Sequence, residues 1–129
     1  RVLREGNQVT VIAYGPMVTT AMQAAEIAQE EGVSIEVVDL RSLSPIDMAT
    51  VLDSVRSTNR VVVAAEAPTF VSVASELAAS ITEQAFYHLE APVIRVGSFD
   101  TPYPPAKLED SYLPDADRIL DAVDRVLAY

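Results

Sequence analysis

Cysteine is absent from the 129-residue chain, and histidine occurs once, at position 88. The absence of cysteine excludes disulfides, zinc sites built on thiolates and a thiol nucleophile. A single histidine cannot form a multi-histidine metal site, and a Ser-His-Asp triad would have to use His88. No apolar run approaches the roughly 18 residues that a membrane span needs.

Glycine is also scarce, with four residues in the chain. Gly15 follows a predicted strand and leads into a predicted helix, but it is a single glycine, whereas a dinucleotide-binding loop needs three glycines at fixed spacing there. The chain has no Walker A pattern and no Gly-x-Ser-x-Gly elbow either. We therefore expect a tight strand-to-helix turn at Gly15 and no phosphate-binding loop.

Positive charge is in short supply, since nine Lys and Arg face nineteen Asp and Glu, and the formal net charge is −10. Such a field repels phosphates and anionic lipid, so we expect neither nucleic acid nor membrane as a partner. A basic protein surface would complement this charge, and the alternative is that the charge serves solubility alone.

The N-terminus shows no signal peptide, because the charged residues 1–5 are not followed by an apolar segment. The chain also begins without Met. We expect it to be a piece of a longer polypeptide, with residues 1–129 as one domain, because no linker, repeat or low-complexity tract interrupts them.

Short β-branched runs alternate with helical stretches along the chain. This pattern predicts an α/β fold of three layers, with an open, mostly parallel sheet of about five strands and helices on both faces. Parallel strands are expected at residues 9–14, 35–39, 60–64 and 93–96, and helices at 17–31, after 44, after 73 and at 115–128. Residues 2–4 are expected to add a short antiparallel edge strand through a hairpin at 5–7.

The second helix has a recognisable start signal. Ser44 suits the capping position, Pro45 the first helical position, and Asp47 the place from which a capping-box acid reaches back. The sequence therefore predicts that this helix begins at Ser44.

Polar residues follow three of the predicted strands. Asp39 and Arg41 end the second strand, and Glu66 follows the third. Since the carboxyl ends of parallel strands share one edge, these side chains are candidates for a small cleft that binds an anion or a partner. The simpler alternative is an Asp39–Arg41 ion pair and a Glu66 carboxylate bonded to backbone amides.

The remaining chemistry-bearing residues form no catalytic set. His88 stands alone in a polar connection where an exposed histidine is expected, and the serines near residues 72–80 have no base in register. The residues by themselves thus indicate a binding or assembly role.

Several segments, read in order, resemble the C-terminal, transketolase-like domain in beta subunits of thiamine-diphosphate 2-oxoacid dehydrogenases. Residues 8–18 are similar to its opening strand and turn, and residues 39–47 to its Asp-Leu-Arg-x-x-x-Pro-x-Asp motif. Residues 89–96 and 100–104 are similar to its last strand and the following loop, and residues 112–114 precede the terminal helix. The resemblance covers essentially the whole chain.

The resemblance implies a parent enzyme that decarboxylates a 2-oxoacid on thiamine diphosphate and acylates the lipoyl group of an acyltransferase. Thiamine diphosphate and its Mg²⁺ would lie on the alpha subunit and another domain, so no cofactor, metal or catalytic residue is expected in this chain. The implied role is assembly, with the alpha subunit and a second beta subunit in an α2β2 enzyme, and docking of the basic subunit-binding domain of the acyltransferase. Carried over by position, Glu90 and the terminal carboxylate of Tyr129 are the candidate docking groups. The implied location is the bacterial cytoplasm, or the mitochondrial matrix in a eukaryote.

Residues 99–105 look more similar to the branched-chain type than to the pyruvate type. One departure is the stretch Ala65-Glu66-Ala67-Pro68, where the branched-chain group typically has His-Glu-Ala-Pro followed by two glycines. Open alternatives are a pyruvate dehydrogenase beta subunit, the matching domain of a transketolase or deoxyxylulose-phosphate synthase, and an anion-sensing domain that uses Arg41.

Overall fold

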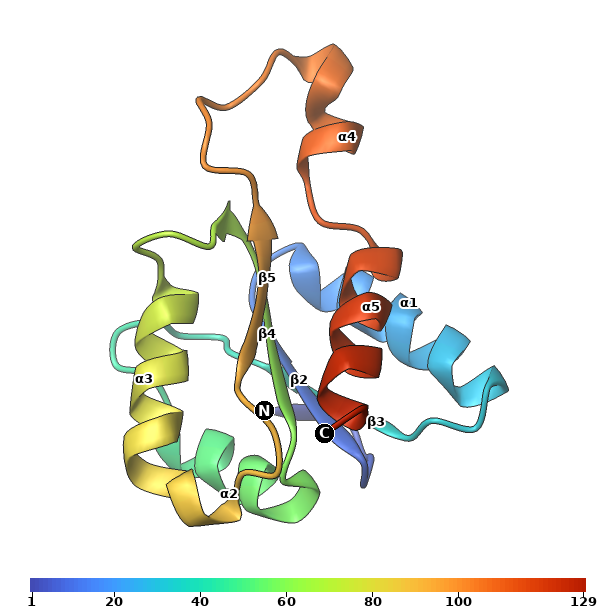
Figure 1. Ribbon diagram of the computed structural model, residues 1–129. Coiled ribbons are helices and arrows are strands. Elements are labelled where there is room, and N and C mark those ends of the chain that lie inside the picture. Colours follow the sequence, from blue (N-terminus) through green and yellow to red (C-terminus); the bar gives the residue numbers. More distant parts are fainter.

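Five strands form one sheet in the order β1-β3-β2-β4-β5 in the computed structural model, which describes residues 1–129 (Figure 1). The strands are β1 (Val2–Arg4), β2 (Val9–Ala13), β3 (Ile35–Asp39), β4 (Val61–Pro68) and β5 (Ile94–Ser98). The helices are α1 (Met17–Glu30), α2 (Met48–Thr58), α3 (Val73–Ala85), α4 (Glu109–Tyr112) and α5 (Ala116–Leu127), with 3-10 turns η1 (Phe86–His88) and η2 (Ala106–Leu108). Strands β2 to β5 are parallel and β1 is antiparallel. The predicted α/β fold with a mostly parallel sheet is confirmed.

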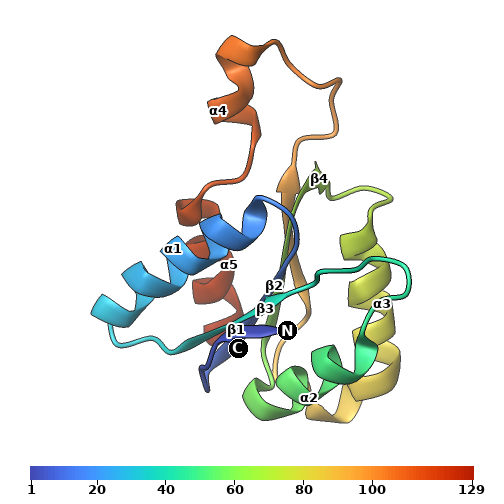
Figure 2. The same ribbon diagram turned by 180° about the vertical axis from the view of Figure 1, so that it is seen from behind.

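Helices α1 and α5 cover one face of the sheet, and α2 and α3 cover the other (Figures 1 and 2). Strand β2 lies at the centre and is buried throughout, so its alternating side chains serve both cores. Val9 and Val11 pack in the core beneath α1 and α5, and Ile12 packs in the core beneath α2 and α3. The run of valines that opens β4 is fully buried for the same reason.

A cluster of polar side chains interrupts the core beneath α2. The Thr10 hydroxyl of β2 lies 3.1 Å from Oε1 of Glu36 on β3 and 2.7 Å from the hydroxyl of Thr58 at the end of α2. All three residues are buried. Because buried polar groups are costly unless they are hydrogen-bonded, this cluster fixes the end of α2 against the sheet.

The hairpin expected between residues 2–4 and 9–14 is wrong, although the antiparallel edge strand exists. Strand β1 pairs with β3, on the far side of β3 from β2. The connection crosses the start of β3 at Gly6, where an added Cβ would lie 2.2 Å from the Glu36 nitrogen. Gly6 has no side chain to block this crossing, so the chain can pass from the edge strand to the centre of the sheet.

Helix α2 begins at Met48 and not at Ser44. Leu43 and Ile46 form an antiparallel bridge, which makes the intervening Ser44–Pro45 pair a turn with a cis peptide bond. The Asp47 carboxylate caps the helix, since it accepts hydrogen bonds from the Thr50 amide at 3.1 Å and the Thr50 hydroxyl at 2.6 Å. Ser44 is therefore not the cap, and Asp47, expected as the acid that reaches back from inside the helix, is itself the capping residue.

Strand β4 runs four residues further than predicted, so Glu66 lies within the strand and not in a loop after it. Between the pairs Ala64–Val96 and Pro68–Ser98, β4 has three residues and β5 has only Gly97. This bulge leaves the outer part of β4 out of register with β5. A Cβ at Gly97 would lie 2.6 Å from the Ala67 carbonyl oxygen, so the bulge depends on glycine there.

Helices α1, α3 and α5 lie where the sequence predicts them, and Gly32 ends α1 with a φ of +83°. The segment of residues 99–115, between β5 and α5, contains η2 and α4, which the sequence pattern did not predict. Figures 1 and 2 show it as an arm that projects beyond the end of β5.

Candidate docking site

An apolar groove of about 660 Å³ lies at the amino end of β5, between the end of α3, the η1 turn and the segment that leads into β5. Most of its lining is hydrophobic. The residues that line it are Ala78, Thr82, Phe86, Tyr87, Leu89, Glu90, Ala91, Pro92, Val93 and Tyr129. Both residues that the resemblance marked for docking, Glu90 and Tyr129, thus line one groove although 38 residues separate them in sequence.

Glu90 is held in place by the turn between α2 and β4. Its amide donates to the Asn59 carbonyl oxygen at 2.9 Å, and the Asn59 side-chain amide donates to the His88 carbonyl oxygen at 2.7 Å. The Glu90 carboxylate accepts from Nη1 of Arg60 at 2.7 Å. The Glu90 side chain is nevertheless 55% exposed, so it can also receive a donor from outside the chain.

Two adjacent aromatic residues, which the sequence reasoning missed, form the rim of the apolar groove. Phe86 and Tyr87 meet edge to face, with ring centroids 5.5 Å apart. Tyr87 is 97% exposed, and Phe86 and Tyr129 are also exposed. Exposed aromatic side chains that line a groove are typical anchors of protein interfaces. Two neighbouring aromatic residues just after a helix end were the available sequence signal.

The strand-end residues Asp39, Arg41 and Glu66 do not form one cleft. Arg41 pairs with Asp39 at 2.9 Å, and both line a cavity of about 300 Å³ with Arg1 and Asp47. Glu66 does not line that cavity, because β2 lies between β3 and β4. The sheet order therefore does not bring these three side chains into one cleft, and no backbone amide donates to the Glu66 carboxylate.

Glu66 instead lies near two tyrosines. Burial, and secondly the charge of Glu66, raise the pKa of the Tyr14 phenol. The pKa of Tyr103 is raised mainly by its hydrogen bond to Glu109, and Glu66 contributes to the same shift. The Glu66 side chain is half-buried and makes no hydrogen bond or ion pair within the chain.

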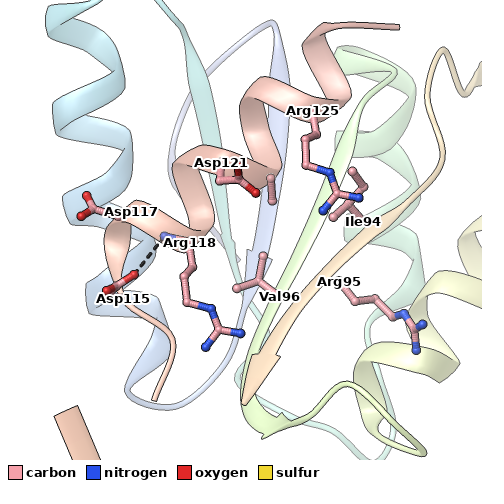
Figure 3. Close-up of a pocket in the computed structure, with 9 residues that line it drawn as sticks. Ile94, Arg95, Val96, Asp115, Asp117, Arg118, Asp121 and Arg125 are labelled. Carbon is pink, nitrogen blue, oxygen red and sulfur yellow. Dashed lines mark hydrogen bonds between the residues drawn. The ribbon is translucent and has the colours of Figure 1, made fainter. Parts of the chain in front are cut away.

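A second cavity, of about 370 Å³, lies between β5 and α5 (Figure 3). Arg118 and Arg125 of α5 extend towards β5, with Asp121 between them on the helix. Arg118 donates to the Gly97 carbonyl oxygen and lies 5.0 Å above the Phe99 ring. Arg118 thereby connects α5 to the end of β5 and to Phe99 at the base of the arm.

The chain contains no group of three or more His, Cys, Asp or Glu side chains that could hold a metal ion. None of its helices combines the length and the apolar character that a membrane-spanning helix requires.

The sequence profile of the family described as "Transketolase, C-terminal domain" matches residues 1–119. The chain belongs to this family. It is 65% identical, over its whole length, to a pyruvate dehydrogenase E1 component subunit beta from Leifsonia xyli subsp. xyli, of which it covers 38%. It is also 51% identical over 127 residues to a 3-methyl-2-oxobutanoate dehydrogenase subunit beta from Mycobacterium tuberculosis, of which it covers 36%.

Solved structures agree with this transketolase C-terminal domain fold. A chain described as a split gene transketolase, in an inactive beta4 tetramer, superposes with a TM-score of 0.86 at 34% identity, and the match covers 99% of the present chain and 41% of that one. A 2-oxoglutarate:ferredoxin oxidoreductase from Magnetococcus marinus shares the fold alone. It superposes with a TM-score of 0.65 at 15% identity, and the match covers 95% of this chain and 18% of that one. The chain spans little more than a third of the length of the curated relatives above.

Proposed function

We propose that this transketolase C-terminal domain belongs to the beta subunit of a thiamine-diphosphate 2-oxoacid dehydrogenase, where it serves assembly and docking. The observation that carries the proposal is 65% and 51% identity, along nearly the whole chain, to two beta subunits of this class. Identity to the split gene transketolase is lower, at 34%. The parent enzyme would decarboxylate a 2-oxoacid and acylate the lipoyl group of the acyltransferase, in an α2β2 assembly with the alpha subunit.

The residues of this chain do not fit thiamine diphosphate or Mg²⁺. No cluster of carboxylates or other ligating side chains is available for the metal, and no glycine loop is available for the diphosphate. No chemical step is therefore assigned to this chain, and the reaction is assigned to other parts of the parent enzyme.

The reconstituted enzyme tests this proposal. The polypeptide that contains this chain should be co-expressed with the alpha subunit and assayed for 2-oxoacid-dependent acylation of a lipoyl domain. We expect acylation that requires both polypeptides. An assembled α2β2 enzyme without acylation of the lipoyl domain by any 2-oxoacid would refute the proposal.

Two types of 2-oxoacid are candidates for the substrate of the parent enzyme, a branched-chain 2-oxoacid and pyruvate. The similarity of residues 99–105 favours the branched-chain type, whereas the 65% identity to a subunit named for pyruvate favours the pyruvate type. We propose the branched-chain type. It predicts a higher kcat/KM for 3-methyl-2-oxobutanoate than for pyruvate in the reconstituted enzyme, and the reverse ratio assigns the pyruvate type.

We further propose that the apolar groove docks the basic subunit-binding domain of the acyltransferase. The groove offers exposed aromatic rings for burial and the half-exposed Glu90 carboxylate for a partner's Lys or Arg. The net charge of −10 would attract a basic domain at long range. Tyr129 lines the same groove, so a docked domain would contact both residues.

Calorimetric titration of the subunit-binding domain into the chain tests this docking. Glu90→Gln keeps an acceptor for Arg60 but removes the charge, so affinity should fall by roughly tenfold and lose part of its salt dependence. Glu26→Ala, which removes an exposed acid from α1 on the opposite face, should leave the affinity unchanged. Binding that is indifferent to salt, or equal in Glu90→Gln and wild type, contradicts the docking site.

A further inference from the structure

Exposed apolar side chains gather on a second surface, at the carboxyl edge of the sheet. Of the ten large hydrophobic residues that are exposed, three line the apolar groove at the opposite end of β5. Five others lie in the loop after β4 or on the arm that follows β5. These five, here called the carboxyl-edge surface, are Phe70, Val71, Phe99, Tyr103 and Leu108.

The arm is ordered by contacts within itself. Tyr103 and Tyr112 meet edge to face, with ring centroids 5.3 Å apart, and the Tyr103 hydroxyl donates to Oε1 of Glu109 at 2.7 Å. Figures 1 and 2 show the arm standing clear of every helix layer. An arm that is built in this way, yet leaves Phe99 and Leu108 each 55% exposed, has the properties of an interface that another surface covers.

The loop after β4 presents its apolar residues in a fixed position. Val71 has a φ of +47°, which is a true outlier for a β-branched residue, and its side chain is 81% exposed. The loop is held by Thr69, whose carbonyl oxygen accepts from Nη1 of Arg95 at 2.8 Å and from the Ser75 hydroxyl at 3.1 Å. Strained backbone of this kind clusters at functional positions.

Electrostatics indicate what the covering surface carries. Glu66 lies at the same edge, half-buried, with no cation or hydrogen-bond donor from its own chain. Tyr14 and Tyr103 are near enough to be affected by its charge. A half-buried carboxylate at an edge that also carries exposed aromatic rings suits a lysine or arginine side chain on the covering surface.

The position of the N-terminus indicates where such a surface comes from. The amino group of Arg1 donates to the carbonyl oxygen of Asp39, the last residue of β3, at 2.9 Å. Since β1 is antiparallel to β3, polypeptide that precedes Arg1 would emerge at the carboxyl edge of the sheet. The relatives are more than twice as long as this chain, and the family is a C-terminal domain, so most of their length precedes the matched region.

We propose that the carboxyl-edge surface packs against the domain that precedes Arg1 in the same polypeptide, and that this domain places a basic side chain opposite Glu66. The inference rests on the proposed function in that it requires a longer parent polypeptide. It assigns the two ends of β5 to different contacts, with the preceding domain at one end and the docked partner at the other.

Hydroxyl-radical footprinting, read by mass spectrometry, tests this assignment because it reports the exposure of each aromatic ring. The samples are the 129-residue chain, the longer polypeptide, and the longer polypeptide with the alpha subunit or the subunit-binding domain. Oxidation of Phe70, Phe99 and Tyr103 should fall by roughly fivefold in the longer polypeptide alone, since residues at the core of an interface lose nearly all their exposed surface. Phe86 and Tyr87 serve as internal controls and should change only when the subunit-binding domain is added.

Charge reversal provides a matched pair of variants. Glu66→Lys in the longer polypeptide should restore oxidation of Phe99 and Tyr103, whereas Glu83→Lys on the exposed face of α3 should not. Protection that appears only with the alpha subunit, or in no sample, overturns the inference. A failure of the proposed docking is distinguishable, because it would leave Phe86 and Tyr87 unprotected while the carboxyl-edge surface is still covered.

Discussion

Replacing Thr10 by valine tests the buried polar cluster most directly. Valine has nearly the same shape as threonine, so the substitution removes one hydroxyl without opening a cavity. That hydroxyl lies 3.1 Å from Oε1 of Glu36 and 2.7 Å from the Thr58 hydroxyl, with all three groups buried. A hydroxyl has one proton, so an arrangement that satisfies both contacts has Thr58 donating to Thr10 and Thr10 donating to Glu36.

The expected cost follows from the partners that remain. Thr58 can still donate to the Ser54 carbonyl oxygen at 3.4 Å or to the Arg60 carbonyl oxygen at 3.2 Å, so it loses little. Glu36 loses its hydroxyl donor in a site that is closed to water. A buried group left without its partner costs about 1–3 kcal/mol, and we place Thr10→Val at about 2–3 kcal/mol of unfolding free energy.

Urea unfolding followed by circular dichroism measures this loss. Thr19→Val, at an exposed position on α1, is the matched control and should change the free energy of unfolding by less than about 0.5 kcal/mol. Adding Glu36→Met to Thr10→Val should recover about 1 kcal/mol relative to additivity, since both partners are then apolar. A Thr10→Val chain as stable as Thr19→Val would refute the reasoning.

Three further perturbations have defined outcomes. The pKa of Tyr14 is raised by burial and by the charge of Glu66. The contribution of the Tyr14 phenol to stability is therefore complete below about pH 10 and is lost as the pH rises through the folded-state pKa. Above about pH 10, the melting temperature should fall more steeply with pH in wild type than in Tyr14→Phe. Gly97→Ala forces a Cβ against the Ala67 carbonyl oxygen and should cost about 1–3 kcal/mol by urea unfolding, against a negligible change for an exposed substitution. Asp115→Ala removes the carboxylate that caps α5 by accepting from the Arg118 amide at 2.9 Å, and it should destabilise the chain by about 1 kcal/mol. Asp115→Asn should recover most of this loss. A Tm unchanged by Asp115→Ala would contradict the capping role.

The sheet and its covering helices could be predicted because they depend on local patterns. The valine run at the start of β4 and the apolar stripe of α5 each determine one element and the face that it buries. The route between elements could not be predicted in the same way. Gly6 reads as a hairpin turn, and only the close approach to the Glu36 backbone shows that it is a crossing point.

The candidate site shows the same limit. The resemblance selected Glu90 and Tyr129, but nothing in their spacing indicates that they share a groove, because that depends on how η1 turns back towards β5. Asp39 and Glu66 appeared equivalent as strand-end carboxylates. Their separation follows from the strand order, in which β2 lies between their strands, and strand order is a property of the whole fold.

Calorimetric titration with thiamine diphosphate and Mg²⁺ tests the central claim, that this domain serves assembly and docking while the chemistry lies elsewhere in the parent enzyme. The 129-residue chain should show no heat of binding, and the longer polypeptide assembled with the alpha subunit should bind the cofactor. Micromolar binding of thiamine diphosphate by the 129-residue chain alone would contradict the account.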